Sequence, residues 1–167
     1  MKSMDNNELK ELLIKCWMTH DGMWFYHCLQ ECGIEKTNKI NKAAVKSMSK
    51  IEIKRIQKFY EIGNIETFQD LQNIMDKALN VFKADFMEFK HTFPAKNQVH
   101  CEMSKCWAYD GILRMGVIDN YQCAIFTRIE GWFEALGINY NASSKLNGCL
   151  MHTNGKCSRD YIFNFKD

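Results

Sequence analysis

The spacing of apolar residues changes at Ala84, and this change limits the chain to a fold that contains both helices and a sheet. Before Ala84, apolar residues recur every three or four positions, the period of an α-helix with one buried face. After it, Met87, Phe89 and Phe93 alternate with polar residues, the period of a β-strand. Helices followed by mostly antiparallel strands form the α+β pattern.

The N-terminal half predicts three helical regions. Asp5 or Asn6 is expected to cap the first helix, Gly33 to end it, and Thr67 to cap the third. Ser47 and Ser49 suggest a bend or a break in the second region as an alternative. The predicted ranges are 6–33, 34–61 and 68–83.

The C-terminal half predicts a sheet of about four antiparallel strands with helices inserted between them. The predicted strands are 87–93, 99–103, 138–142 and 161–165, the predicted helices are 107–115 and 123–136, and 148–157 is rich in turns. We expect a single α+β domain over 1–167. Its helical part is 1–83, and the sheet with the cysteine-rich segment is 84–167.

Charge and hydropathy limit the partners. The net charge of +2 arises from 22 basic and 20 acidic residues, so nothing in the charge balance indicates nucleic acid. No window approaches the roughly 18 apolar residues of a membrane span, and the N-terminus lacks a signal-peptide pattern. We therefore expect a cytoplasmic protein, in which eight cysteines indicate metal binding, reactivity or burial rather than disulfides.

Four of these cysteines follow the spacing Cys-x16-Cys-x25-Cys-x7-Cys. They are Cys106, Cys123, Cys149 and Cys157. Four thiolates suit a structural zinc ion, with iron or an iron–sulfur cluster as the alternative. Buried, inert thiols and redox chemistry are further alternatives. Cys101 lies on an alternating strand and is interpreted as a core residue.

The last three of these cysteines carry a family resemblance. The matching positions are Cys123, Gly148, Cys149, Gly155 and Cys157, followed by YIFNF. This pattern resembles the C-terminal half of the four-vinyl-reductase-like domain, which includes ligand-sensing modules of phenol-responsive transcription activators. The resemblance implies zinc beside a buried small-molecule pocket, with a carboxylate shortly before the second cysteine as the remaining ligand. Residues 144–147 contain no acid, so Cys106 becomes the candidate fourth ligand, with His152 or Cys101 as alternatives.

A second resemblance spans nearly the whole chain. CWMTHDGMWF near the start and YQCAIFTRIEGWFEALG later are similar to a widespread, mostly uncharacterised prokaryotic family. That family is distantly similar to the L-2-amino-thiazoline-4-carboxylate hydrolases. The similarity implies a related fold and a related cysteine site, and it leaves the function open.

The first helix carries a second group of candidate residues. Cys16, His20, Trp24 (or Met23) and His27 recur at helical spacing, a mixture of imidazole and large aromatics that is typical of a pocket wall. His20 and Asp21 are the catalytic candidates, and a half-buried structural histidine is the alternative for His20. The candidate ligand-binding residues are Trp17, His20, Trp24, His27, Arg128 and Trp132. Arg128 is a candidate for binding a carboxylate with two hydrogen bonds, and pairing with neighbours of Glu130 or with solvent is the alternative.

These features support three hypotheses. The first is a metal-containing module that binds or senses a small organic ligand. The second is a hydrolase in which His20, Asp21 or the metal activates water. The third is an interaction protein with a purely structural metal. The expected partners are a small organic ligand and a second copy of the chain, paired through the apolar stripe of the first helix, with no nucleic acid and no membrane.

Overall fold

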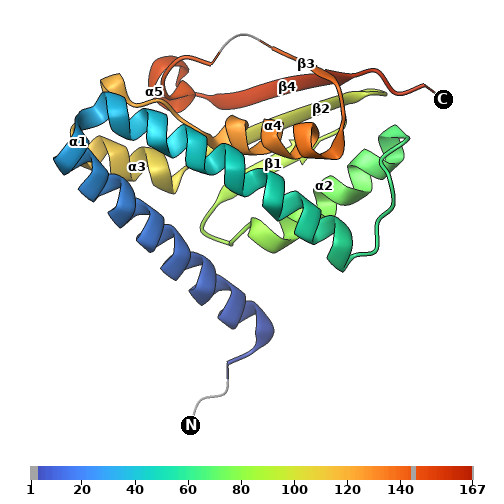
Figure 1. Cartoon of the computed structure of the whole chain (residues 1–167), viewed down its shortest axis with the longest axis horizontal. Coiled ribbons are helices and arrows are strands. Elements are labelled where there is room, and N and C mark those ends of the chain that lie inside the picture. Colours follow the sequence, from blue (N-terminus) through green and yellow to red (C-terminus); the bar gives the residue numbers. More distant parts are fainter. Residues whose placement is uncertain (1–3, 144–145, 167) are drawn as a thin grey trace.

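A helical hairpin forms the N-terminal part of the computed structural model, which describes residues 4–143 and 146–166. Helix α1 spans Asn6–Phe59, and Gly33 divides it into a first arm, residues 6–32, and a second arm, residues 34–59. Gly33 has φ 73° and ψ 168°, a conformation open almost only to glycine. The two arms diverge from this bend (Figure 1). The predicted helix end at Gly33 is confirmed.

Side-chain caps begin both N-terminal helices, as predicted. The Asp5 carboxylate accepts hydrogen bonds from the backbone N–H groups of Asn7 and Glu8, each at 2.8 Å. Helix α2, Phe68–Phe82, begins at Thr67, whose hydroxyl accepts from the N–H of Asp70 at 3.2 Å. Such caps satisfy backbone donors that have no partner within the helix. The alternative break near Ser47 is wrong, because the second arm is helical to its end.

Four antiparallel strands form the sheet in the order β1-β2-β4-β3. Their bounds are Glu88–Thr92 for β1, Gln98–Lys105 for β2, Tyr140–Ala142 for β3 and Cys157–Phe163 for β4. Val99 pairs with Tyr161 and Met103 pairs with Cys157, and all four side chains are buried. The α+β fold with an antiparallel sheet of four strands is confirmed.

The inserted helices are α3, Trp107–Arg114, the short 3-10 helix η1, Ile118–Asn120, α4, Ile125–Leu136, and α5, Leu150–Asn154. Three predictions are corrected, the first being the last strand, which begins at Cys157 rather than at residue 161. Helix α4 begins at Ile125 rather than at Cys123, because Ala124 occupies the capping position with non-helical φ and ψ. The turn-rich segment contains α5, because the Cys149 carbonyl accepts hydrogen bonds from the N–H groups of His152 and Thr153.

Helix α4 lies between the second arm and the sheet (Figure 1). On the sheet side, the ring of Phe133 packs edge-on against those of Tyr161 and Phe163, with centroids 5.2 and 5.0 Å apart. On the other side, Gly131 faces Ser49, and both are buried. Within the described residues, no helix combines the length and apolar character that crossing a membrane requires.

Candidate functional site

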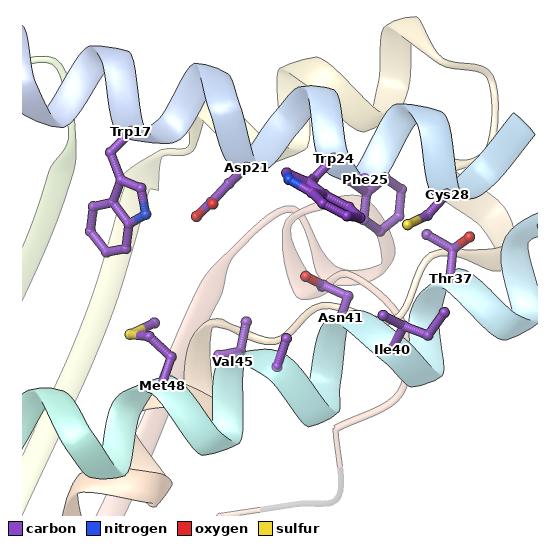
Figure 2. A pocket seen from close by; sticks show the side chains of 11 residues that line it. Trp17, Asp21, Trp24, Phe25, Cys28, Thr37, Ile40, Asn41, Val45 and Met48 are labelled. Atoms are coloured by element: carbon purple, nitrogen blue, oxygen red, sulfur yellow. The ribbon is translucent and has the colours of Figure 1, made fainter.

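Two adjoining cavities lie next to the helical hairpin. One, of about 240 Å³, lies between the two arms of α1 (Figure 2). The other, of about 220 Å³, is lined by both arms together with β2, α3, α4 and Phe82 of α2. The residues that line both cavities are Trp17, Asp21, Asn41, Val45 and Met48. Most of the lining is apolar with a few polar groups, which is typical of sites for small organic molecules.

Asp21 is an acidic group in the wall that the two cavities share. Figure 2 shows its carboxylate and the Asn41 amide pointing into the space between the arms. Burial raises the pKa of Asp21, although the nearby His20 and Arg128 act in the opposite direction. The Asp21 carboxyl can therefore exchange a proton, or accept a hydrogen bond, inside a mainly apolar wall.

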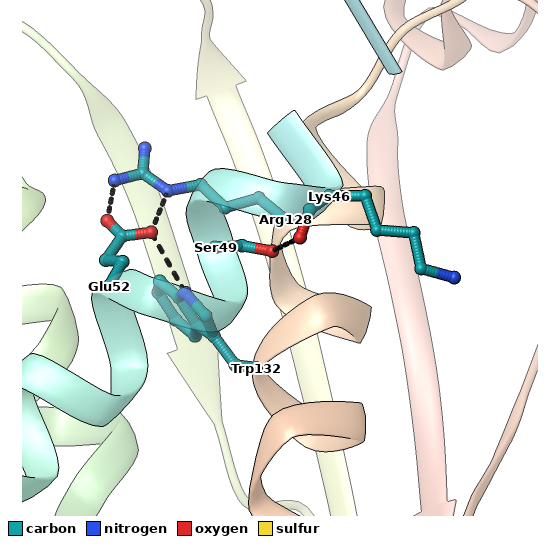
Figure 3. A network of polar contacts seen from close by, with 5 residues as sticks. All are labelled: Lys46, Ser49, Glu52, Arg128 and Trp132. Atoms are coloured by element: carbon teal, nitrogen blue, oxygen red, sulfur yellow. Dashed lines mark hydrogen bonds and ion pairs between the residues drawn. The ribbon is translucent and has the colours of Figure 1, made fainter. Parts of the chain in front are cut away.

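Arg128 reaches the same space, but its charge has a partner within the chain (Figure 3). Its Nε donates to Glu52 Oε2 at 2.9 Å, and its Nη2 donates to Glu52 Oε1. The Trp132 indole N–H donates to Glu52 Oε2 at 3.1 Å. The guanidinium also lies over the ring of Phe82, 4.6 Å from its centroid. The carboxylate that the sequence led us to expect at Arg128 is thus supplied by Glu52.

The four cysteines of the predicted metal site lie at the ends of four elements that meet beside the second cavity. Cys106 precedes α3, Cys123 precedes α4, Cys149 precedes α5, and Cys157 begins β4. The Cys123 N–H donates to the Gly148 carbonyl at 3.4 Å, which ties the segments of Cys123 and Cys149 together. We call these four residues the cysteine neighbourhood.

Burial and mutual repulsion act on these thiols. Burial raises the pKa of Cys157 to about 12 and that of Cys123 to about 11, and other cysteines of the neighbourhood raise both further. Burial also raises the pKa of Cys106, whose sulfur accepts a hydrogen bond from the Tyr109 N–H at 3.4 Å. These electrostatic interactions show that the four sulfurs lie close enough to affect one another.

The cysteine neighbourhood is nevertheless not assembled as a coordination site. Across 4–143 and 146–166, no group of three or more His, Cys, Asp or Glu side chains is arranged so that it could hold a metal ion. Residues 144 and 145, part of the acid-free segment before Cys149, lie outside the described residues. The alternative fourth ligands are occupied elsewhere: His152 Nε2 lies 2.9 Å from Asp119 Oδ1, and Cys101 is fully buried in the core.

The remaining predicted site residues are distributed over both faces of the first arm. Trp17 and Trp24 line the cavity between the arms. The His20 side chain is 68% exposed and lies 3.8 Å from the Asp21 carboxylate, and His27 is exposed against Tyr26. Of the two catalytic candidates, Asp21 lines the cavities and His20 does not.

Sequence reasoning missed several residues of the site, among them Asn41, Val45 and Met48 in the shared wall, and also Tyr121 and Glu52. Tyr121 is buried among the cysteines, and burial together with the nearby Cys123, Cys106 and Cys149 raises its pKa well above the ordinary value. Glu52 is the buried partner of Arg128. Tyr121 lies two residues from Cys123 in sequence, which is the one local signal that pointed to it.

The matches to known proteins include one family model and solved structures. Residues 2–149 match the model of a family described as a family of unknown function, DUF6125. No curated protein matches the sequence. A solved structure described as "Probing the function of heme distortion in the H-NOX family" aligns with 100% of this chain and 75% of that chain, at 14% identity and a TM-score of 0.40. The family match covers most of the chain, and the protein therefore belongs to the DUF6125 family.

Proposed function

We propose that this protein is a small-molecule-binding module that takes an apolar organic ligand into the cavities beside α1 and holds a metal ion on the cysteine neighbourhood. One observation carries the proposal: Cys106 and Cys123 line the same cavity as Trp17 and Met48. The apolar space and the thiols are thus parts of one site. Both arms of α1 form the cavity wall, so ligand binding would change how the arms pack, which is a route for sensing.

The donor set of the cysteine neighbourhood fits a thiophilic metal such as zinc or iron. Cys106 and Cys123 precede helices α3 and α4, where unpaired backbone N–H groups and the helix dipole favour a thiolate. Cys149 and Cys157 flank the short α5 and complete a set of four sulfurs. A bound metal would supply a structural cross-link between these four segments.

Metal analysis of protein purified without oxygen tests the metal half of the proposal. We expect about one metal ion per chain, as in a four-thiolate site, and its loss in Cys123→Ser and Cys149→Ser. Cys28→Ser is the matched control, because Cys28 lies on α1 outside the cysteine neighbourhood, and it should keep the metal. A folded wild-type protein without metal would contradict this half.

Toluene tests the cavity half, because a cavity lined mainly by apolar side chains can take up a small aromatic molecule. We expect toluene to raise the melting temperature of the wild-type protein by mass action. Val45→Trp should abolish the shift, since Val45 lines both cavities. Leu113→Trp, at an exposed position on α3, should retain it. Equal shifts in both variants would show that toluene binds elsewhere.

A further inference from the structure

The first arm of α1 presents a second apolar stripe that its own chain leaves exposed. The stripe follows the positions Leu9, Leu13, Cys16, His20, Met23 and His27, all of them exposed. Their spacing alternates between four and three residues, which is the a/d repeat of a coiled coil. We call these six positions the seam. Residues that sequence analysis assigned to a pocket wall, His20 and His27 among them, thus lie on this outward face.

The seam has apolar flanks, and it lies opposite the side of the arm that packs on the fold. Leu12 and Tyr26 flank it and are 46% and 39% exposed. Ile14 lies on the opposite side and is buried, and Phe25 packs against the ring of Tyr121. One helix that is apolar on both sides indicates that the outer side is covered by something other than this chain.

We infer that two copies of this chain pair through their seams to form a two-helix coiled coil. A heptad seam is recognised by another heptad seam, and a second copy supplies one without any further partner. Leu9, Leu13 and Met23 are 45%, 59% and 49% exposed, so the seam offers apolar area that a partner can bury. Figure 1 shows the first arm extending away from the rest of the molecule toward the N-terminus.

Charge supports a second copy over a membrane surface. The six seam positions include no Asp, Glu, Lys or Arg, so two copies can face each other without like-charge repulsion. A helix that lies on a membrane carries cations on its polar side. Here the nearby lysines are turned to the fold: Lys10 donates to the Asn80 carbonyl at 3.3 Å, and Lys15 lies over the ring of Phe86.

Sedimentation velocity of the full chain under reducing conditions tests the pairing. We expect wild-type protein at twice the 19.6 kDa of one chain. L13E combined with M23E should give a monomer with unchanged circular dichroism, its dissociation constant raised by at least about 100-fold. L113E combined with I162E is the matched control, because these exposed positions lie on α3 and β4, and it should remain a dimer.

A second measurement, chemical cross-linking, tests the pairing with the side chains of the seam nearly unchanged. A short bismaleimide should cross-link wild-type protein into a covalent dimer, and Cys16→Ser should abolish this product while Cys32→Ser retains it. A monomeric wild-type protein overturns the inference. A monomer that binds phosphatidylcholine vesicles overturns it as well, because the seam would then contact a membrane surface. A dimer that persists in the L13E and M23E variant, or a cross-link that does not need Cys16, also overturns it.

Discussion

Replacing Glu52 with Ala should lower the free energy of unfolding by about 3–5 kcal/mol, the range for removing one partner of a buried ion pair. The carboxylate accepts from Arg128 through two nitrogens and from the Trp132 indole. The substitution leaves a partly buried guanidinium and a buried indole N–H without their acceptor. A buried donor without an acceptor costs more free energy than one ordinary hydrogen bond contributes. Urea denaturation followed by circular dichroism measures the effect.

Glu134→Ala is the control for Glu52→Ala. Glu134 pairs with Lys46 at 2.9 Å and Lys50 at 2.8 Å, but its side chain is 34% exposed. Ion pairs of that kind contribute about 0–1 kcal/mol, so this variant should unfold close to the wild-type denaturant midpoint. Equal losses in the two variants would show that burial of the Glu52 pair has no special role.

A double substitution separates the charge from the packing. Replacing Glu52 by Leu and Arg128 by Met together removes both charges and keeps apolar volume next to Phe82. The double variant should recover most of the stability lost on replacing Glu52 alone, because exchanging a whole buried ion pair for apolar residues is often neutral. If the double variant is as unstable as Glu52→Ala, the lost stability comes from altered side-chain packing and not from the unpaired charge of Arg128.

Replacing Gly131 with Ala should cost about 1–3 kcal/mol, the usual effect of forcing an extra carbon into a packed core. The added Cβ would overlap Ser49 Oγ and lie 3.2 Å from Ser49 Cβ. Ser49 cannot withdraw into solvent, because it is fully buried and its hydroxyl donates to the Lys46 carbonyl at 2.9 Å (Figure 3). The second arm and α4 would have to separate.

Thermal and urea unfolding of three variants test this contact. Gly111→Ala is the control, since no atom lies within 4 Å of the added carbon and alanine favours a helix by up to about 1 kcal/mol. Adding Ser49→Ala to Gly131→Ala removes the overlapping hydroxyl and should restore part of the loss. A Gly131→Ala variant as stable as the wild type would mean that the two helices do not approach as closely as described.

The two sides of the first arm explain where sequence reasoning about this site succeeded and where it stopped. Helical periodicity placed Trp17 and Asp21 on α1, and both line the cavities. The same periodicity could not decide which side of the helix faces the fold, because apolar residues occupy both sides. His20 and Asp21 are neighbours in sequence and their side chains are 68% and 60% exposed, yet only Asp21 lines the cavities.

The cysteine pattern shows a similar division. Spacing selected Cys106, Cys123, Cys149 and Cys157, and the structure places their sulfurs within electrostatic reach of one another. It also adds Tyr121, which lines the second cavity together with Cys106 and Cys123 and which no spacing rule predicts. The metal itself stays a prediction, to be tested by the metal content of the cysteine variants.

The sequence alone determined the local elements, because periodicity, caps and glycines act within one turn of helix or a few residues of strand. The capped starts at Asp5 and Thr67, the bend at Gly33 and the change of period at Ala84 all belong to this class. Only the tertiary structure decided which elements touch. Glu52 and Arg128 are 76 residues apart, and their pairing depends on how α4 packs against the second arm. Such contacts depend on how whole helices and strands pack and bury their surfaces, and local sequence patterns do not predict this packing.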